Sequence, residues 1–215
     1  MKDRVCVIST KNPNQNLINT ITNVKLYYDE FDIIIIDSDS TDKTFFNLVP
    51  KDCIIEYCQN KNWELGAWTY TFNKYNDYKV YMFIQDTLTP NCRIPGLDKH
   101  NYNNGTIYTF HYTAKLKDGD YFTNLQNIYR FTDLHFISEL SPDLQITGAA
   151  HSSFILNNEH VYTILELENA YVTKNLSKSK IDSWLSERTV GILADKLNRI
   201  NIWDYFTKIH GNRND

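Results

Sequence analysis

Three aspartates that follow one apolar run are the first residues whose types and spacing indicate chemistry. The run is Ile33–Ile36, and the residues after it are Asp37, Ser38, Asp39, Ser40, Thr41 and Asp42. Carboxylates in this position could accept hydrogen bonds from ribose hydroxyls or a base N–H, or hold a divalent cation. An alternative is helix capping, with Asp39 or Ser40 as the cap and Asp42 in the first turn. Capping explains Asp37 poorly, because Asp37 ends the strand before any cap position.

A second apolar run also ends close to a carboxylate. Val80–Ile84 is followed by Gln85, Asp86 and Thr87. Continuous apolar runs are typical of strands that are buried on both faces in a parallel sheet. Ligands of open parallel sheets bind just beyond the carboxyl ends of the strands. Asp37 and Asp86 are therefore predicted to line one cleft.

The elements that must position these residues begin with a strand, a helix and a second strand. We expect the two strands at Arg4–Ser9 and Phe31–Asp37. Between them, one face of an amphipathic helix is formed by Leu17, Ile21, Val24 and Tyr28. Asn12 is predicted to cap this helix, with Pro13 at its first position. The three elements form a βαβ unit, which should be right-handed.

The rest of the chain continues the alternation of strands and helices. Further strands are expected at Cys53–Cys58, Lys79–Ile84 and Thr106–Tyr112. Helices are expected at Thr41–Leu48, from Gly66 to about Tyr75, at Asn157–Glu168 and at Ile181–Leu197, with a final strand or short helix at Ile200–Phe206. This order predicts an α/β fold in which helices flank a mostly parallel central sheet, organised as one domain over residues 1–215.

Composition and charge argue against several classes of function. The net charge is −4, from 22 basic and 26 acidic residues without a basic stripe, so nucleic acid is not an expected partner. The cysteines Cys6, Cys53, Cys58 and Cys92 form no Cys-x-x-Cys pair, which predicts a reducing compartment without disulfides. The sequence shows neither a signal peptide nor an apolar stretch of about 18 residues. We therefore expect a soluble, cytoplasmic protein with no membrane span.

Three segments within the first 90 residues form an ordered set, namely Val5–Thr10, Ile34–Asp42 and Asn62–Ala67. This set resembles the nucleotide-sugar glycosyltransferases of the GT-A type, especially the family-2 group, in which an apolar strand typically ends in Asp-Asp-Gly-Ser-Thr-Asp. Here Ser38 and Asp39 replace the Asp-Gly pair. The resemblance implies a single Rossmann-like GT-A domain, with a nucleotide-sugar-binding half at residues 1–90 and an acceptor-side half at 91–215.

The resemblance also implies an activity, the transfer of a sugar from a nucleoside-diphosphate sugar to an acceptor hydroxyl. A UDP-sugar is the favoured donor, and the acceptor would be a glycan or a protein. The implied nucleotide-sugar-binding residues are Ser9, Thr10, Asp37, Ser38, Asp39, Asn62, Gly66 and Gln85. Thr10 and Asp37 would contact the base and ribose. Gly66 would let a ligand approach the backbone, unless its small size serves helix–sheet packing instead.

Catalytic roles follow from the same resemblance. Asp86 lies where the family places its Asp-x-Asp metal motif and would hold Mn²⁺ or Mg²⁺ against the donor's two phosphates. The cation stabilises the negative charge that the leaving diphosphate gains. The segment has only one carboxylate, so Gln85, Thr87 or His151 could supply a further ligand.

Glu187, followed by Arg188, loosely resembles a late Glu-Asp or Glu-Arg segment of the family. Glu187 is therefore the candidate general base of an inverting reaction, with Asp143 and Glu139 as alternatives. The sequence leaves retention of stereochemistry open.

Two other classes of function stay open. A catalytically silent carbohydrate or protein interaction module on the same fold would fit the reduced motif at Asp86. A nucleotidyltransferase would need a glycine-rich, basic phosphate loop after the first strand. Ser9–Asn14 offers one lysine and no glycine there, which makes this class the weakest of the three.

Overall fold

The structure is a computed structural model that describes residues 2–59, 63–97, 105–116, 136, 139–173 and 180–209. Its central sheet has the strand order β3-β2-β1-β4-β7-β6-β8 among these residues. The strands are β1 Lys2–Thr10, β2 Asp32–Ser38, β3 Ile54–Cys58, β4 Tyr78–Gln85, β6 Thr106–Lys115, β7 Gln145–Asn157 and β8 Asn198–Asn201. The first four pair in parallel, β7 is antiparallel to β4 and β6, and β8 is parallel to β6. The predicted α/β fold with a mostly parallel sheet is confirmed.

Helices cover both faces of this sheet. The α-helices are α1 Gln15–Tyr27, α2 Trp63–Lys74, α4 Asn158–Thr173 and α5 Lys180–Leu193. Short 3-10 helices are η1 Thr44–Leu48, η3 Ala194–Lys196 and η4 Trp203–Tyr205. A small second sheet pairs β5 Leu88–Pro90 with β9 Phe206–Lys208. The segment that was expected to be a strand or a short helix therefore contains both.

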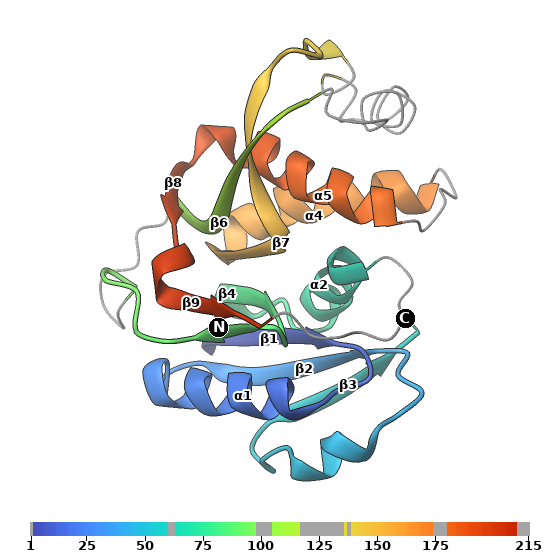
Figure 1. Cartoon of the computed structure of the whole chain (residues 1–215), viewed down its shortest axis with the longest axis vertical. Helices are drawn as coiled ribbons and strands as arrows, with labels where there is room; N and C mark the ends of the chain where they lie inside the picture. The colour runs from blue at the N-terminus through green and yellow to red at the C-terminus, as the bar shows by residue number, and fades with distance from the viewer. Residues whose placement is uncertain are drawn as a thin grey trace.

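The isoleucine run of β2 is buried on both faces, as its composition predicts. Ile34 and Ile36 belong to the core cluster that includes residues of α2, α4 and α5. Ile33 and Ile35 belong to the opposite cluster, which includes Leu17 and other residues of α1. Figure 1 shows the resulting layers, with α1 apart from α4 and α5, which lie together beside β7. Because successive side chains of a strand point to opposite faces, one apolar strand supplies both cores.

The start of α1 differs from the prediction. Asn14, and not Asn12, is the N-cap, and its side chain accepts a 2.8 Å hydrogen bond from the Asn16 backbone N–H. Asn12 precedes Pro13, which disfavours the helical conformation, and adopts a left-handed φ of 51°. The predicted face of the helix is correct, because Leu17, Ile21, Val24 and Tyr28 are all buried.

The predicted helix entry at Gly66 is wrong. Helix α2 already begins at Trp63, so Gly66 lies inside its first turns, where it is buried. Glu64 occupies the first turn, where an acidic side chain interacts favourably with the helix dipole. Asn62 lies outside the described residues.

Candidate active site

The carboxyl ends of β1 and β4 meet where the order of the strands reverses. From β1 the chain proceeds outward through β2 and β3, and then returns to place β4 on the other side of β1. Such a switch point is where open α/β sheets bind their ligands. Ser9 pairs with Gln85 there, and the Ser9 carbonyl accepts a 3.0 Å hydrogen bond from the Asp86 N–H. This backbone bond fixes Asp86 at the edge of the sheet.

Thr10 and Asp86 are in direct contact at this switch point. The Thr10 hydroxyl donates to Asp86 Oδ2 at 2.6 Å, and both residues are buried. Thr20 of α1 donates to the Asp86 carbonyl at 3.0 Å. Side chains from β1 and α1 thus orient the single aspartate of the predicted metal motif.

Asp37 lies at the same edge, one strand away from Thr10. The two residues are register partners between β1 and β2, and Asp37 is 1% exposed. Asp37 Oδ1 accepts a 3.0 Å hydrogen bond from the Ser40 N–H, and Lys43 Nζ lies 3.5 Å from Asp37 Oδ2. Asp37 therefore also shapes the loop after β2, a structural role that the capping argument did not predict.

The loops after β1 and β2 are bound to each other. Asn12 Oδ1 accepts hydrogen bonds from the backbone N–H groups of Thr41 and Asp42 at 2.9 and 3.2 Å. The Asn12 N–H donates to the Ser40 hydroxyl at 2.6 Å. Asp42 Oδ1 accepts from the Thr44 N–H at 2.9 Å, but η1 begins at Thr44 with Lys43 as its N-cap, so the expected capping by Asp39 or Ser40, with Asp42 in the first turn, is wrong. These bonds hold the loop that carries Asp39.

Asp39 is exposed and has a left-handed φ of 63°. In the sequence pattern of the family, glycine stands at this position. Glycine adopts this conformation without strain, and aspartate is one of the few other residues that tolerate it. Asp39 can therefore stand in place of glycine without changing the conformation of the loop. Ser38, before it, is partly exposed.

Gln85, which directly precedes Asp86 in the sequence, forms hydrogen bonds to two other elements. Its amide Nε2 donates to Glu64 of α2, and its Oε1 accepts from Lys208 Nζ of β9 at 3.2 Å. Thr87 accepts from Lys208 Nζ at 2.9 Å and donates to Gln85 Oε1 at 3.1 Å. Glu64 and Gln85 are both buried. The polar network around Asp86 thus includes one carboxylate and one ammonium that sequence reasoning missed.

A bulge in β7 contacts the candidate base, Glu187 of α5. Thr109 pairs with Phe154 and His111 pairs with Ala149, so residues 150–153 lie opposite Phe110 alone. His151 and Ser152 both have left-handed φ, 60° and 45°. The His151 N–H donates to Glu187 Oε1 at 2.9 Å.

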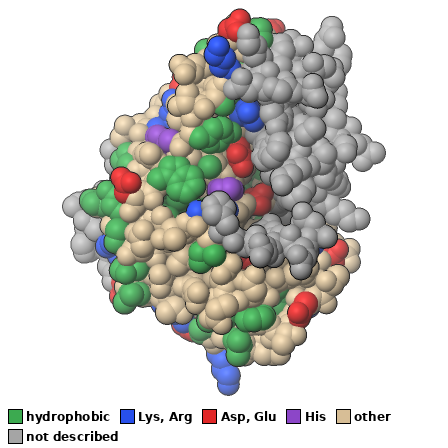
Figure 2. All heavy atoms as spheres, in the orientation of Figure 1, with side chains coloured by type: hydrophobic (Ala, Val, Ile, Leu, Met, Phe, Trp, Pro, Cys, Tyr) green, Lys and Arg blue, Asp and Glu red, His purple; other side chains and the backbone are tan. Residues whose placement is uncertain are grey.

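The bulge is held from both sides. The indole N–H of buried Trp68 in α2 donates to the Ser152 carbonyl at 2.9 Å. The ring of His151 lies edge-on to Trp203 of η4, with centroids 6.4 Å apart. Figure 2 shows histidine, acidic and apolar side chains close together on one face of the molecule, over η4 and the end of β7.

The electrostatic surroundings of Glu187 suit a proton acceptor. The pKa of Glu187 is raised to about 7, mainly by burial and to a smaller extent by nearby Glu64. The His151 N–H, Arg188 and Lys208 act in the opposite direction and lower this pKa. A carboxyl that titrates near neutral pH can accept a proton efficiently in general base catalysis. The influence of Glu64 and Lys208 also indicates that Glu187 lies within electrostatic reach of the Gln85 network.

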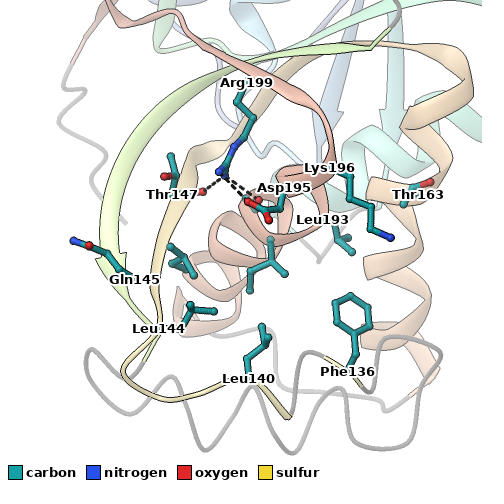
Figure 3. A pocket seen from close by; sticks show the side chains of 13 residues that line it. Phe136, Leu140, Leu144, Gln145, Thr147, Thr163, Leu193, Asp195, Lys196 and Arg199 are labelled. Atoms are coloured by element: carbon teal, nitrogen blue, oxygen red, sulfur yellow. Dashed lines mark hydrogen bonds and ion pairs between the residues drawn. The ribbon is translucent and has the colours of Figure 1, made fainter.

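The other candidate bases lie elsewhere. Glu139 and Asp143 are exposed and belong to the segment before β7. Leu140 and Leu144 of this segment line a mostly apolar cavity of about 580 Å³, together with residues of α5 and Arg199 (Figure 3). Arg199 donates to the Thr147 carbonyl at 3.3 Å and to Asp195 at 3.0 Å. None of the predicted site residues lines this cavity.

Asp86 is the predicted site residue whose side chain is best suited to hold a divalent cation. Among the described residues, no group of three or more His, Cys, Asp or Glu side chains is arranged to hold an ion. Mg²⁺ and Mn²⁺ nevertheless accept carboxylate and phosphate oxygens, and Mg²⁺ is often bound through one or two carboxylates plus substrate phosphates and waters. Asp86 offers one such carboxylate, buried at the expected edge of the sheet. His151 as a further ligand stays a prediction.

Two residues near Asp37 were also missed. Tyr57 of β3 is the register partner of Asp37 and is 56% exposed. Lys43 Nζ lies 4.6 Å from the centre of the Tyr57 ring, in cation–π geometry. The place of Tyr57 directly before the end of the third strand is the signal in the sequence that could have indicated it.

Solved structures with this fold include glycosyltransferases. The chain is similar to GalNAc-T7, solved with UDP, GalNAc and Mn²⁺, with a TM-score of 0.52 and 10% identity over 76% of this chain. It is also similar to core-mannan synthase A from Aspergillus fumigatus in an Mn/GDP form, with a TM-score of 0.51 and 11% identity over 92% of this chain. It spans 37% of the GalNAc-T7 chain and 70% of the mannan synthase chain.

These similarities define the class of the fold. At 10–11% identity they show that the chain has the GT-A fold of nucleotide-sugar glycosyltransferases, as the sequence predicted. No protein-family model and no curated protein sequence matches the chain. The described residues include no helix that is long and apolar enough to cross a membrane.

Proposed function

We propose that this protein is a glycosyltransferase that moves a sugar from a nucleoside-diphosphate sugar to an acceptor hydroxyl. The observation that supports this most is the contact between Thr10 and Asp86 at the switch point of a GT-A fold. Asp37, one strand away, gives the same edge a second buried carboxylate. Two separate polar groups at one edge of the sheet suit a nucleotide sugar, because its nucleoside and its diphosphate require different polar partners.

In this proposal the nucleoside lies at the Asp37 side and the diphosphate at the Asp86 side. Asp37 accepts hydrogen bonds from the ribose or the base, with Thr10 and Ser9 beside it. Tyr57 offers an exposed aromatic ring next to Asp37 on which a base could stack. UDP is the favoured nucleotide, and GDP is the alternative to compare with it.

Glu187 is proposed as the base that receives the proton of the acceptor hydroxyl. Its place beside the β7 bulge and its raised pKa support this role. Asp86 would supply the protein's carboxylate ligand to Mn²⁺ or Mg²⁺. When bound, this cation would add positive charge at the diphosphate as it leaves.

Binding of candidate donors by the purified protein tests the proposal. UDP- and GDP-sugars should raise the melting temperature, because a ligand that binds only the folded state stabilises it by mass action. Release of free UDP or GDP should then increase when an acceptor sugar is added. A protein with no shift for any nucleotide sugar, with or without Mn²⁺, would contradict the proposed function.

A silent interaction module remains the second candidate. The specific observation in its favour is that Asp86 is the single carboxylate of its segment, with Gln85 before it and Thr87 after it. This candidate predicts that nucleotide sugars or glycans bind but that no nucleoside diphosphate is released. The release assay therefore separates the two functions.

A further inference from the structure

The last described strand places a lysine against the two residues that flank Asp86 in the sequence. Lys208 of β9 is the register partner of Leu88 in β5. The backbone N–H of Ile209 donates to the Thr87 carbonyl at 2.9 Å. Backbone hydrogen bonds thus hold Lys208 against the segment that directly follows Asp86, whatever its side chain contacts.

The side chain of Lys208 returns toward the switch point. Its ammonium donates to Thr87 Oγ1 at 2.9 Å and to Gln85 Oε1 at 3.2 Å. These two residues flank Asp86 in the sequence. The positive charge of Lys208 is therefore located at the edge of the sheet where the proposed function puts the diphosphate.

The side chain of Gln85 connects Lys208 to a residue of α2. An amide can donate and accept at the same time, whereas an ionised carboxylate only accepts. Gln85 donates to Glu64 through Nε2 and accepts from Lys208 through Oε1. Gln85, directly before Asp86 in the sequence, thus connects a buried acid to a cation.

Glu187 provides independent support for the location of this charge. Lys208 is among the groups that lower the pKa of Glu187, so the ammonium acts across the space between β9 and α5. Lys208 therefore lies within electrostatic range of the proposed base as well as in contact with Gln85 and Thr87.

We infer that Lys208 binds the diphosphate of the donor and stabilises the leaving nucleoside diphosphate. The inference rests on the proposed function and adds a residue to it. In the transfer step, the bond between the anomeric carbon and the phosphate oxygen breaks, and its electron pair stays on that oxygen. The acceptor oxygen bonds to the anomeric carbon, and its proton passes to Glu187. The ammonium stabilises the charge that grows on the diphosphate.

Lysine suits this task because its ammonium is a compact point charge that binds phosphate oxygens without a fixed bidentate geometry. The residue also supplies positive charge permanently, whether or not a divalent cation is bound. The inference therefore predicts measurable recognition of the diphosphate when divalent cations are removed.

The test compares nucleoside diphosphates with nucleosides in EDTA. Affinities of UDP, uridine, GDP and guanosine are measured by calorimetry for the wild type, Lys208→Ala and Lys208→Arg. The wild type should bind its preferred diphosphate more tightly than the parent nucleoside. Lys208→Ala should lose about tenfold or more of the diphosphate affinity and keep that of the nucleoside, as expected for hydrogen bonds from a charged group. Lys208→Arg should recover part of the loss.

Lys79→Ala is the matched control, because it removes the same charge from an exposed lysine paired with Asp3 at the other end of β4. It should leave all four affinities unchanged. Equal losses of nucleoside and diphosphate affinity in Lys208→Ala, together with a lower melting temperature, would show a structural role and overturn the inference.

The remaining outcomes separate the inference from the proposed function. An unchanged ratio of diphosphate to nucleoside affinity in Lys208→Ala would overturn the inference and leave the proposed function intact. A wild type that prefers neither diphosphate over its nucleoside in EDTA would do the same. A wild type that binds none of the four compounds, and no nucleotide sugar with Mn²⁺, would overturn both.

Discussion

Thr10 and Asp86 are 76 residues apart in the sequence, and the Thr10 hydroxyl donates to Asp86 Oδ2 at 2.6 Å. The bond joins the ends of two parallel strands across the switch point of the sheet. It therefore orients the carboxylate on which the proposed metal and diphosphate site depends.

Thr10→Val should weaken both the fold and the proposed site. Valine has the shape of threonine but cannot donate, so the buried Asp86 carboxylate loses a partner, at a cost of about 1–3 kcal/mol. Urea unfolding measures this loss. Thr10→Ser keeps the hydroxyl and is the control, and it should retain most of the stability. Equal stability of the wild type and the valine variant would contradict a contribution from this bond.

Asp37→Asn should weaken nucleoside binding while the fold persists. The amide oxygen can still accept from the Ser40 N–H, but the negative charge beside Lys43 is removed. We expect a loss of about 1.5–3 kcal/mol in uridine or UDP affinity, the range for hydrogen bonds to charged groups. Calorimetry checks this, with exposed Asp52→Asn as the control for loss of one acid. Unchanged affinity in a folded Asp37→Asn protein would remove Asp37 from the site.

Asp86→Asn should abolish the coupling between metal and donor. If Asp86 and the donor phosphates share one cation, Mn²⁺ should raise donor affinity by about 5- to 150-fold, the usual range of such coupling. The asparagine variant should bind the donor equally with and without Mn²⁺ and keep a residual nucleoside affinity. Donor titrations in EDTA and in Mn²⁺ measure both. If the donor affinity and the turnover of the wild type are the same with and without Mn²⁺, Asp86 has no metal-binding role.

Glu187 should make both stability and activity depend on pH. Its pKa in the folded protein, about 7, is above its usual 4.5, so the folded state binds the proton more tightly. The stabilising contribution is fully present below about pH 4.5 and is lost as the pH rises through about 7. At about 1.4 kcal/mol per pKa unit, the loss is on the order of 3 kcal/mol.

Comparison of the wild type with Glu187→Gln over a range of pH tests this prediction. The groups that act on this carboxyl are Glu64, Arg188, Lys208 and the His151 N–H, and the variant leaves them in place. Unfolding free energies of the two proteins should diverge between pH 4.5 and 7, with the wild type losing stability relative to the variant. Transfer activity of the wild type should rise over the same range, since the base must be deprotonated. Parallel stability profiles would contradict the raised pKa.

Gly191→Ala should destabilise the contact between α5 and β7. A Cβ at Gly191 would lie 2.0 Å from the Thr147 carbonyl oxygen, so the helix or the strand must move. We expect a loss of at least about 3 kcal/mol in unfolding free energy, the upper end for overpacked cores. Gly96→Ala is the comparison, because nothing lies within 4 Å of its Cβ and only its φ of 80° is unfavourable. A smaller effect at Gly191 than at Gly96 would contradict this.

The strands and their polar ends were predictable because the information is local. The apolar run before Asp37 indicates a strand buried on both faces, and Asp37 follows where the run stops. The run before Asp86 does the same. The parallel register then brings both acids to one edge, as predicted.

The contacts around those acids were not predictable, because they depend on pairings between distant segments. Lys208 reaches Gln85 only because β9 pairs with β5, and nothing near residue 208 indicates that pairing. The bulge at His151 depends on the register between β6 and β7. The predicted start of α2 at Gly66 is wrong because small residues do not mark a helix entry by themselves, whereas the acid at Glu64 favours the first turn of a helix.

The pairing of β4 with β7 joins the two predicted halves of the protein, residues 1–90 and 91–215, within one sheet. Residues Val80–Ile84 are buried, and β4 has β1 on one side and β7 on the other. A fragment that ends near residue 90 would leave one long side of β4 with unpaired N–H and C=O groups on an apolar strand. Such an edge is a template for pairing with other chains. The nucleotide-sugar-binding half, expressed alone, should therefore aggregate and not behave as an independent domain.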